Sequence, residues 1–461
     1  MAGVGGGSGS GTSPEDLAAQ AEAAPDLTAA AVEVIPPEIV AQSLGQYLRG
    51  WFARVRAGDA GVLPVVAALV AVVIVFEFLS PNNVYLSPRN LVDLFSQSTV
   101  FIILAVGETF VLLLGEIDLS IGYVAAIGGI VAGLLVQPQA TSPDLFHNWP
   151  WLGACAVAVL VCAAIGLIHG LIITRLKLPS FVVTLAGQIF WFGIMIVILG
   201  QAGGLSVQPS SPGDQQEIYG IVYRYLDVWF AWVGLAVVLL LVGGSMWMRD
   251  SSRRRSGLVA PPVGLTIAKI AFLAVAGIVV VAVCDIDRKI GATSSPILGV
   301  PWVVPLVLGV VGGATLLLER TQFGRHMYAV GGNPEAARRA GVGVVSIRTW
   351  AFIISAATAG IGGIVAVSYQ GGITTNFNGG QEVLYAVAAA VIGGTSLMGG
   401  RGRAIHGLIG GLTIGAIYNG LYLLGLPVQY QYIATALVLL AAVAVDALAR
   451  RNATSGSMAR V

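Results

Sequence analysis

The sequence contains little charge. Only 10% of its 461 residues are Asp, Glu, Lys or Arg, against about 25% in ordinary soluble proteins, and 56% are hydrophobic. A composition of this kind excludes a soluble globular enzyme. The 24 basic and 23 acidic residues nearly cancel to a net charge of +1, so no overall charge favours binding to nucleic acid.

Cysteine and histidine are also scarce. The three cysteines, Cys155, Cys162 and Cys284, lie in or beside apolar stretches, where a small and weakly polar side chain is common. The four histidines are scattered along the chain without the spacing of metal ligands. We therefore predict neither a disulfide nor a metal site.

Apolar stretches long enough to cross a bilayer, about 20 residues each, recur along the chain. They predict an all-α polytopic membrane protein with about ten to twelve transmembrane helices. The candidate spans are residues 62–79, 98–115, 119–136, 151–174, 180–200, 227–247, 264–284, 299–318, 349–367, 382–398, 404–424 and 428–448.

The basic residues indicate an orientation, because short loops rich in Lys and Arg stay in the cytoplasm. If the N-terminus is cytoplasmic, nineteen of the 24 basic residues fall on the cytoplasmic side and four fall outside. We therefore expect both termini to be cytoplasmic.

Two glycine-rich octets resemble each other. Residues 115–122 read GEIDLSIG and residues 393–400 read GGTSLMGG, and each lies between two apolar runs. Because transporters often consist of two structural repeats with interrupted helices, this echo suggests two repeats, and a re-entrant span would lower the count below twelve. We expect Glu116 and Asp118 to cap the helix that begins near Leu119.

The chain is predicted to have three parts. Residues 1–60 form an Ala-, Gly- and Pro-rich tail that we expect to be disordered and cytoplasmic, and the lack of Lys or Arg before Arg49 argues against a signal peptide. Residues 61–448 form the transmembrane domain, which includes a cytoplasmic segment at 319–348. Residues 449–461 form a cytoplasmic tail.

The cytoplasmic segment contains a short helix. Asn333 is a suitable N-cap, Pro334 suits the first helical position, and Glu335 favours the positive end of the helix dipole. Gly341 can adopt the left-handed conformation that ends a helix. The predicted helix over 334–340, about 10 Å long, is too short to be stable unless it packs against another surface.

This helix offers a face of small side chains. Ala336, Ala337 and Ala340 give it a low profile that the groove of another protein could approach closely. On physical grounds alone, the alternative is an amphipathic helix lying on the membrane surface.

The segment resembles the coupling segment of permease subunits in ATP-binding-cassette importers, specifically the bacterial sugar permeases of the ribose and xylose type. In that family a Gly-Arg-x-x-Tyr-Ala-x-Gly-Gly-Asn-Pro-Glu-Ala-Ala-Arg segment docks on the ATPase subunit. The matching residues of this chain are Gly324, Arg325, Tyr328, Ala329, Gly331, Gly332, Asn333, Pro334, Glu335, Ala336, Ala337 and Arg338. The resemblance implies that this segment, with Gly341 at the end of its helix, couples the chain to an ATPase.

Other segments share the resemblance. Residues 115–122 look like the family's Gly-x-Ile-Asp-Leu-Ser-x-Gly, residues 175–187 look like its Arg-Leu-x-x-Pro-Ser-Phe stretch, and residues 393–411 look like its glycine-rich C-terminal region. The likeness extends over residues 62–448. An extra helical pair at 227–284 looks like that of the D-xylose permeases, so the resemblance favours xylose or a related pentose as the transported monosaccharide.

The resemblance also implies partners. None of the chain's three lysines, Lys177, Lys269 and Lys289, lies in a Walker A sequence, so ATP and Mg²⁺ are expected on a partner ATPase and no cofactor is expected on this chain. The other expected partners are an extracytoplasmic sugar-binding protein and a second copy of the permease, in a bacterial plasma membrane. Closure of the ATPases would move the helix at 334–340 and switch the permease between inward-open and outward-open states.

A neutral sugar needs a path of hydrogen-bonding side chains and aromatic faces. The candidates inside apolar spans are Glu108, Thr109, Gln188, Tyr385, Tyr418 and Asn419. A buried Glu108 is costly unless it is paired or protonated, so we expect it to face a cavity or a partner helix. Each of the others can instead bond a neighbouring helix.

Two alternatives remain open at the level of the sequence. A transporter driven by an ion gradient could use Glu108, Glu116 or Asp118 as its coupling carboxylate, but it would leave the short helix without a role. A cassette permease for another small solute, such as branched-chain amino acids, would use the same architecture. A membrane-embedded enzyme would need a convergent His, Asp or Ser constellation, which the sequence does not suggest.

Overall fold

The computed structural model describes residues 45–47, 49–50, 63–138, 147–200, 203–208, 213–258, 260–289, 296–427, 429–433, 435–437 and 440. The predicted tails at 1–60 and 449–461, and most of the predicted span 428–448, lie outside these residues. The chain divides into two compact units, Met1–Ala53 with Ser245–Lys269 and Arg54–Gly244 with Ile270–Val461. Residues 245–269, which include most of α10 and the start of α11, belong to the first unit, and the other features described below belong to the second.

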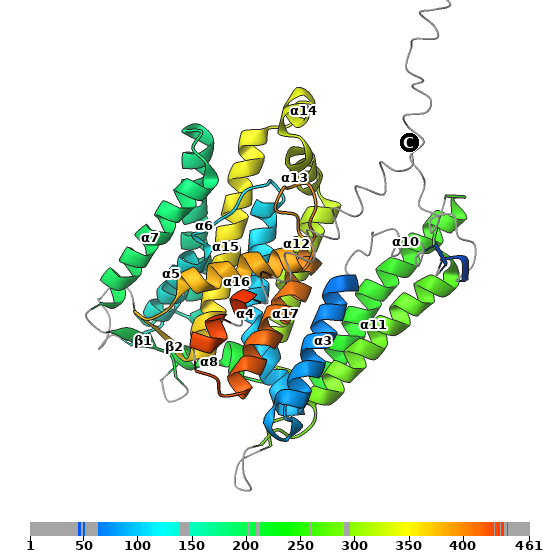
Figure 1. The fold of residues 1–461 in the computed structure, drawn as a ribbon, viewed down its shortest axis with the longest axis horizontal. Coiled ribbons are helices and arrows are strands. Elements are labelled where there is room, and N and C mark those ends of the chain that lie inside the picture. The colour runs from blue at the N-terminus through cyan, green and yellow to red at the C-terminus, as the bar shows by residue number, and fades with distance from the viewer. Residues whose placement is uncertain are drawn as a thin grey trace, which may run out of the picture. The chain divides into compact units, whose positions relative to one another are not determined.

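Eight helices of the described residues are long and apolar enough to cross a membrane (Figure 1). They are α4 (Pro88–Leu112), α6 (Trp151–Arg175), α7 (Ser180–Leu199), the continuous run of α9 (Val228–Val238), a π-helical turn (Leu239–Gly243) and α10 (Gly244–Arg255), then α11 (Val263–Cys284), α12 (Val303–Arg320), α15 (Val344–Gln370) and α17 (Ala404–Leu423). A helix pairs its own backbone N–H and C=O groups with each other, and this is necessary in a membrane because hydrocarbon offers them no hydrogen bonds. The predicted all-α polytopic fold is confirmed.

Three apolar helices are shorter, namely α3 (Leu63–Leu79), α5 (Ile121–Leu135) and α16 (Gly379–Ile392). The 15 residues of α5 and the 14 of α16 each span about 21–23 Å, less than the roughly 30 Å of a hydrocarbon core. The octet 115–122 leads into α5, and the octet 393–400 follows α16. Each octet therefore lies at one end of a short helix, which is where the break of an interrupted helix is expected.

Smaller elements mark two opposite ends of the long helix α15. Beside its last residue, β2 (Gly372–Thr374) pairs antiparallel with β1 (Gly204–Ser206). Two further small elements are the helix α8 (Asp214–Tyr223) and the 3₁₀ turn η1 (Pro81–Asn83). Before the first residue of α15 come α13 (Gln322–Gly332) and α14 (Pro334–Arg339). We call these two ends the strand side and the α14 side.

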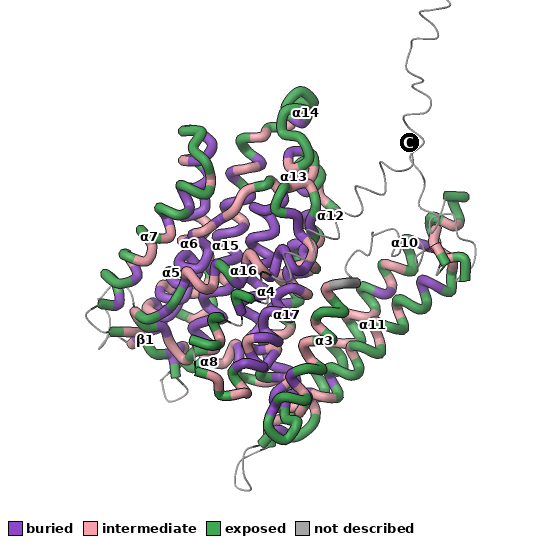
Figure 2. The backbone as a smooth tube through the Cα atoms, viewed as in Figure 1, coloured by how far each residue is buried: buried purple, intermediate pink, exposed green. Residues whose placement is uncertain are grey.

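The centre of the structure is formed by α4, α5, α15 and α17 (Figure 2). The apolar window of α4 is 94% buried, whereas those of α6 and α7 are 39% and 28% buried, so the latter leave broad apolar surface for lipid. Very close backbone contact joins α15 to α5, because a Cβ on Gly363 would lie only 1.7 Å from the carbonyl oxygen of Ala125. Glycine at such positions lets membrane helices approach closely.

Several predicted span boundaries are wrong. Helix α4 begins at Pro88 rather than at residue 98, because the Ser87 hydroxyl caps it by accepting the N–H of Asn90 at 3.3 Å. The polar residues of its first turns explain why the predicted span started too late. The predicted span 382–398 ends at Ile392, since the chain leaves the helix before Gly394, which has φ +116°. The predicted span 227–247 continues as helix to Arg255.

Candidate functional site

The ends of α14 carry the caps that its sequence predicts. Oδ1 of Asn333 accepts hydrogen bonds from the backbone N–H of Glu335 at 3.1 Å and of Ala336 at 3.0 Å. The helix comprises Pro334–Arg339, and Gly341 beyond it adopts φ +83°, the left-handed region that favours glycine. The predicted short helix is confirmed, although it ends one residue earlier.

The two faces of α14 differ. Ala337 is only 6% exposed and belongs to the largest apolar cluster of the structure. Ala336 and Ala340 are exposed, as are Glu335 and Arg338, whose charged groups lie 3.7 Å apart. The prediction of a docking face that includes Ala337 is therefore wrong, because a six-residue helix cannot stand alone and uses this side chain to anchor itself.

Preceding α14, the helix α13 is fixed to the body of the structure. Oγ1 of Thr321 accepts the N–H of Gly324 at 3.2 Å, and a Cβ on Gly324 would lie 2.0 Å from the carbonyl oxygen of Leu318. The hydroxyl of Tyr328 donates to the carbonyl of Gly402 at 2.7 Å. Two residues of the predicted coupling segment thus have structural roles, since position 324 has no room for a side chain and the Tyr328 hydroxyl forms a hydrogen bond to another segment.

The end of α13 lies between the two octets. A Cβ on Gly331 would lie 1.8 Å from the carbonyl oxygen of Leu113 and 2.9 Å from the nitrogen of Gly400. The N–H of Gly400 donates to the same Leu113 carbonyl at 2.9 Å, and a Cβ on Gly399 would lie 2.9 Å from the nitrogen of Gly115. We call Leu113, Gly115, Gly331, Gly399 and Gly400 the loop junction. Segments far apart in sequence touch there through backbone atoms.

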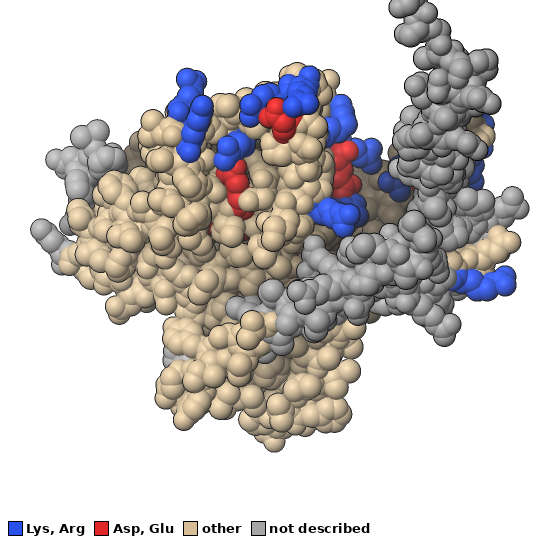
Figure 3. All heavy atoms as spheres, turned by 45° about the horizontal axis from the view of Figure 1, so that its top comes forward, with Lys and Arg blue, Asp and Glu red and all other residues tan. Residues whose placement is uncertain are grey.

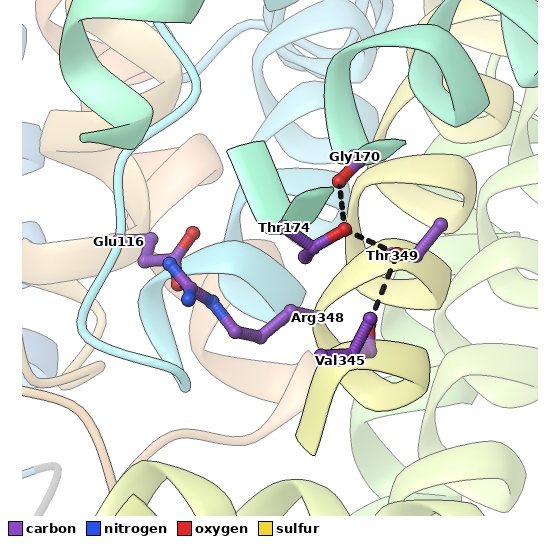
Figure 4. A network of polar contacts seen from close by, with 6 residues as sticks. All are labelled: Glu116, Gly170, Thr174, Val345, Arg348 and Thr349. Carbon is purple, nitrogen blue, oxygen red and sulfur yellow. Dashed lines mark hydrogen bonds and ion pairs between the residues drawn. The ribbon is translucent and has the colours of Figure 1, made fainter. Parts of the chain in front are cut away.

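A second connection to the first octet comes from the residues that follow α14 (Figure 4). Nε of Arg348, in the first turns of α15, forms an ion pair and hydrogen bond with Oε1 of Glu116. One position later, Thr349 and Thr174 of α6 share a hydrogen bond of 3.3 Å between their hydroxyls. Burial raises the pKa of Glu116, and the Arg348 guanidinium opposes that shift. The expected capping role of Glu116 is wrong, because its carboxylate is paired with Arg348.

Asp118 organises the rest of the octet. Its Oδ1 accepts the backbone N–H of Ser120 at 3.0 Å and the Ser120 hydroxyl at 2.5 Å, immediately before α5 begins. The Ser120 hydroxyl also lies 3.2 Å from Nδ1 of His169, whose Nε2 accepts the indole N–H of Trp191 at 3.2 Å. Oε1 of Glu108 accepts the N–H of Asp118 at 3.0 Å. Three helices, α4, α6 and α7, therefore hold this octet.

The six predicted path residues do not form one group. Glu108 and Thr109 are fully buried near the octets, where Thr109 donates to the carbonyl of Ala105 at 2.8 Å. Gln188 is half-buried on α7, and its amide nitrogen would lie 3.1 Å from a Cβ on Gly380, at the start of α16. Glu108 and Thr109 thus lie near the octets, whereas Gln188 lies beside the start of α16.

Tyr385 and Tyr418 come together around Phe101. The Phe101 ring lies 5.1 Å from that of Tyr385 and 5.9 Å from that of Tyr418, both edge to face, and the two tyrosine rings are 6.3 Å apart. Asn419 is buried and exchanges hydrogen bonds of 2.9 and 3.1 Å with Asn90 of α4. Its amide also donates to Oε1 of Gln97 at 3.1 Å.

Sequence reasoning missed three polar residues beside these rings, namely Gln97, Tyr369 and Glu382. Gln97 lies one turn before Phe101 on the same face of α4, and this spacing could have been recognised if the span had been started at Pro88. Tyr369 and Glu382 lie at the ends of helices, where they resemble ordinary boundary residues.

Basic side chains gather on the α14 side, over the ends of α12, α13 and α14 (Figure 3). The basic residues of these helix ends and neighbouring loops are Arg175, Lys177, Arg320, Arg325, Arg338, Arg339, Arg348, Arg401 and Arg403. Arg325 is exposed, and Arg403 donates to Glu319 at 2.6 and 2.8 Å. This side therefore presents a positively charged surface around the exposed face of α14.

A bundle of apolar helices with two interrupted helices, joined to a short exposed helix on a basic face, defines a multi-pass membrane transport subunit. The chain belongs to the family described as "Branched-chain amino acid transport system / permease component", which matches residues 90–443. It is a protein of the inner membrane.

Individual relatives are transport permeases rather than enzymes. The chain is 31% identical over 403 residues to the xylose transport system permease protein XylH of Escherichia coli K12, covering 87% of this chain and 96% of the relative. It is 30% identical over 379 residues to the ribose import permease protein RbsC of the same strain, covering 82% and 91%. The D-allose transport system permease protein AlsC is 28% identical over 382 residues, covering 82% and 90%. No solved structure matches the chain significantly.

Proposed function

We propose that the chain is the membrane-spanning permease subunit of an ATP-driven monosaccharide importer, and that it carries D-xylose or a related pentose across the bacterial plasma membrane. The names of the xylose, ribose and allose relatives support the sugar class. Of these three, the xylose relative is matched over the largest share of its own length, 96%. This favours xylose over the other two sugars.

The observation that carries the proposal is how α14 is connected. Its exposed face is free to meet a partner, while α13 before it reaches the loop junction and Arg348 after it pairs with Glu116. A displacement of α14 would therefore act on the first octet from two directions. Packed backbone contacts such as that of Gly331 with Leu113 transmit movement because they leave no room for independent adjustment.

The proposal assigns the energy source and the partners. ATP and Mg²⁺ bind to a separate ATPase beneath the α14 side, which is then cytoplasmic together with both termini. The basic residues of that side support this orientation, because positive charge is retained in the cytoplasm. A sugar-binding protein delivers the substrate on the strand side, and a second copy of the permease completes the pair that two ATPases require.

Two other functions remain distinguishable by experiment. The family description names branched-chain amino acids, which supports an amino-acid permease as the second candidate. A gradient-driven transporter is the third, and it would make the exposed face of α14 unnecessary.

Reconstitution tests the proposal. The chain, its ATPase and its binding protein are placed in proteoliposomes, and uptake of labelled xylose, ribose and leucine is measured with ATP inside or with imposed ion gradients. We expect pentose uptake that requires ATP and survives the collapse of ion gradients by ionophores. Leucine uptake would select the second candidate, and uptake that needs only a gradient would select the third.

Docking at α14 is tested with a matched pair of exposed substitutions. Ala336→Asp adds a negative charge to the exposed face of α14, and Asn376→Asp adds the same charge beside β2 at the other end of α15. We expect the first variant to lose copurification of the ATPase, and the second to retain it. Equal behaviour of the two variants would contradict a docking role for α14.

A further inference from the structure

A compact set of polar and aromatic side chains lies where α4, α15, α16 and α17 meet. We call it the α16 cluster, and its members are Gln97, Phe101, Tyr369, Glu382, Tyr385 and Tyr418. Tyr369 is the last residue but one of α15, next to β2, so the cluster belongs to the strand-side half of the helices. The cluster is separate from the loop junction, which lies beyond the other end of α16. Figure 1 shows α16 running across the direction of α4 and α15.

Aromatic rings form the apolar part of the cluster. Phe101, Tyr385 and Tyr418 contact one another edge to face, with ring centroids 5.1 to 6.3 Å apart. The hydroxyl of Tyr385 accepts a hydrogen bond of 2.5 Å from the side-chain amide of Gln381. The rings can present C–H and π surface, and the Tyr385 hydroxyl, which accepts from Gln381, still has its own proton to donate.

The amide of Gln97 is oriented by its neighbours. Its Oε1 accepts the side-chain N–H of Asn419 at 3.1 Å, which leaves the two N–H groups of its amide as the donors that it can offer. On the other side, the Tyr223 hydroxyl donates to the Tyr369 carbonyl at 2.8 Å, and the two tyrosine rings stack 6.4 Å apart. The amide and the phenol are thus positioned side chains rather than mobile ones.

Glu382 is the unusual member. Its Oε2 is buried, yet it has no hydrogen-bond partner among the residues that the structure describes. Glu382 lies three residues before Tyr385 on α16, so the two side chains share a face of that helix, and the Tyr385 ring lies 6.3 Å from that of Tyr418. A location in the first turn of α16 explains why a carboxylate is favourable there, but it does not explain an oxygen that is buried and unpartnered.

The chemistry of the cluster suits a neutral polyhydroxyl ligand. Amide, phenol and carboxylate groups bond hydroxyls, and ring faces pack against the C–H groups of a sugar. A zwitterionic amino acid would need a cation for its carboxylate, and the cluster contains none. On that side Arg89 and Arg288 act on Asp93, which lies one turn outward from Gln97.

We propose that the α16 cluster is a sugar-binding site on the transport path, in which Glu382 Oε2 accepts a hydrogen bond from a sugar hydroxyl, the Tyr418 hydroxyl bonds a second one, and the rings of Tyr385 and Tyr418 contact the sugar face. The inference rests on the proposed function, because it assigns the contacts of the transported pentose. It assigns Gln97, Tyr369 and Glu382 as substrate contacts in addition to Tyr385 and Tyr418, which the sequence analysis had already proposed for the path.

The test uses Glu382→Gln in the reconstituted complex, with uptake of the parent pentose and of its monodeoxy analogues. For each sugar the variant rate is divided by the wild-type rate, so the preference of the common binding protein cancels. We expect a loss of about 10- to 100-fold for the parent sugar, as for a hydrogen bond to a charged group. For the analogue that lacks the bonded hydroxyl, the ratio should return towards one.

A matched pair on α17 tests the site without changing its charge. Tyr418→Phe removes a hydroxyl inside the cluster, and Tyr422→Phe removes one a turn further along, where the residue is 63% exposed. We expect a loss of about 3- to 10-fold for the first, the size of one neutral hydrogen bond, and no change for the second. Recovery of the ATPase with each variant serves as the check of folding.

The outcomes separate the two proposals. Equal ratios for every sugar in Glu382→Gln, or full activity of both Glu382→Gln and Tyr418→Phe, would overturn the site while leaving ATP-driven pentose uptake intact. If the wild-type complex takes up no pentose, the proposed function fails, and the sugar site fails with it. If the Glu382→Gln variant does not fold, the comparison of uptake by Tyr418→Phe with uptake by Tyr422→Phe tests the site instead.

Discussion

Arg348 and Glu116 form an ion pair although 232 positions separate them in the chain. Arg348 follows the short helix α14, and Glu116 lies in the octet that precedes α5. The pair is partly shielded, with 11% of the Glu116 side chain and 32% of the Arg348 side chain exposed. An ion pair in this position links the proposed docking helix to an interrupted helix, so it should matter more to coupling than to folding.

The first prediction concerns this pair. Glu116→Arg and Arg348→Glu each place two like charges together, and we expect each to reduce ATP-driven uptake at least tenfold while ATP hydrolysis continues. The double exchange Glu116→Arg with Arg348→Glu restores opposite charges and should recover a substantial part of the uptake. The measurement is the ratio of sugar transported to ATP hydrolysed in proteoliposomes. If the double variant is no better than the single ones, the pair has no coupling role of its own.

The second prediction compares two adjacent glycines of α13. Gly331→Ala would place a Cβ 1.8 Å from the Leu113 carbonyl oxygen, whereas a Cβ on Gly332 meets nothing within 4 Å. We expect Gly331→Ala to cost about 1–3 kcal/mol, as overpacking does, and to impair uptake. Gly332→Ala should be neutral or stabilising by up to about 1 kcal/mol, because alanine favours a helix. Thermal unfolding in detergent and uptake assays measure both effects, and similar losses in the two variants would contradict the close contact.

A third prediction concerns the buried face of α14. Ala337→Asp places a carboxylate among apolar side chains, and we expect a loss of about 2–5 kcal/mol in the local stability of this segment. Ala336→Asp, on the exposed face, should change that stability by less than about 0.5 kcal/mol. Hydrogen exchange of residues 334–342 without any ATPase present measures the difference. Equal protection in both variants would show that Ala337 is not an anchor.

The contrast between these two alanines shows what the sequence could predict. The caps of α14 depend on residues within a few positions of one another, so Asn333, Pro334 and Gly341 were sufficient to locate it. Which of its alanines is buried depends on segments far away in the chain, and sequence reasoning assigned Ala337 to the wrong face.

The same distinction applies to the octets and to the α16 cluster. The similarity of the two octets in sequence suggested paired repeats, but the contact of Gly331 with Leu113 between the octets had no local signal in the sequence. Hydropathy located most long helices, yet it started α4 ten residues late and so left Gln97 outside the span. Glu382 was missed because a carboxylate at the start of a helix is ordinary until its buried environment is known.

The last prediction concerns pH and the strand side. Arg224 donates two hydrogen bonds to the Glu217 carboxylate, at 2.5 and 2.9 Å, across the end of α8. The hydrogen bonds from Arg224 lower the pKa of Glu217, outweighing a small opposing effect of burial. Both side chains are substantially exposed, at 33% for Glu217 and 49% for Arg224, so solvent screening limits the contribution to about 0.2–1 kcal/mol.

The sign of the pH dependence follows from that lowered pKa. A carboxyl group with a lower pKa in the folded state stabilises that state fully above its unfolded pKa, which for glutamate is about 4.3, and the stabilisation is lost as pH falls through the folded value. We therefore expect Glu217→Gln to weaken hydrogen-exchange protection of residues 214–223 at pH 7, and the difference from wild type to shrink towards zero near pH 3. Raising the salt concentration at pH 7 should reduce it as well. A difference that stays constant from pH 7 to pH 3 would mean that Glu217 supports α8 by packing alone, and that its pairing with Arg224 adds no stability.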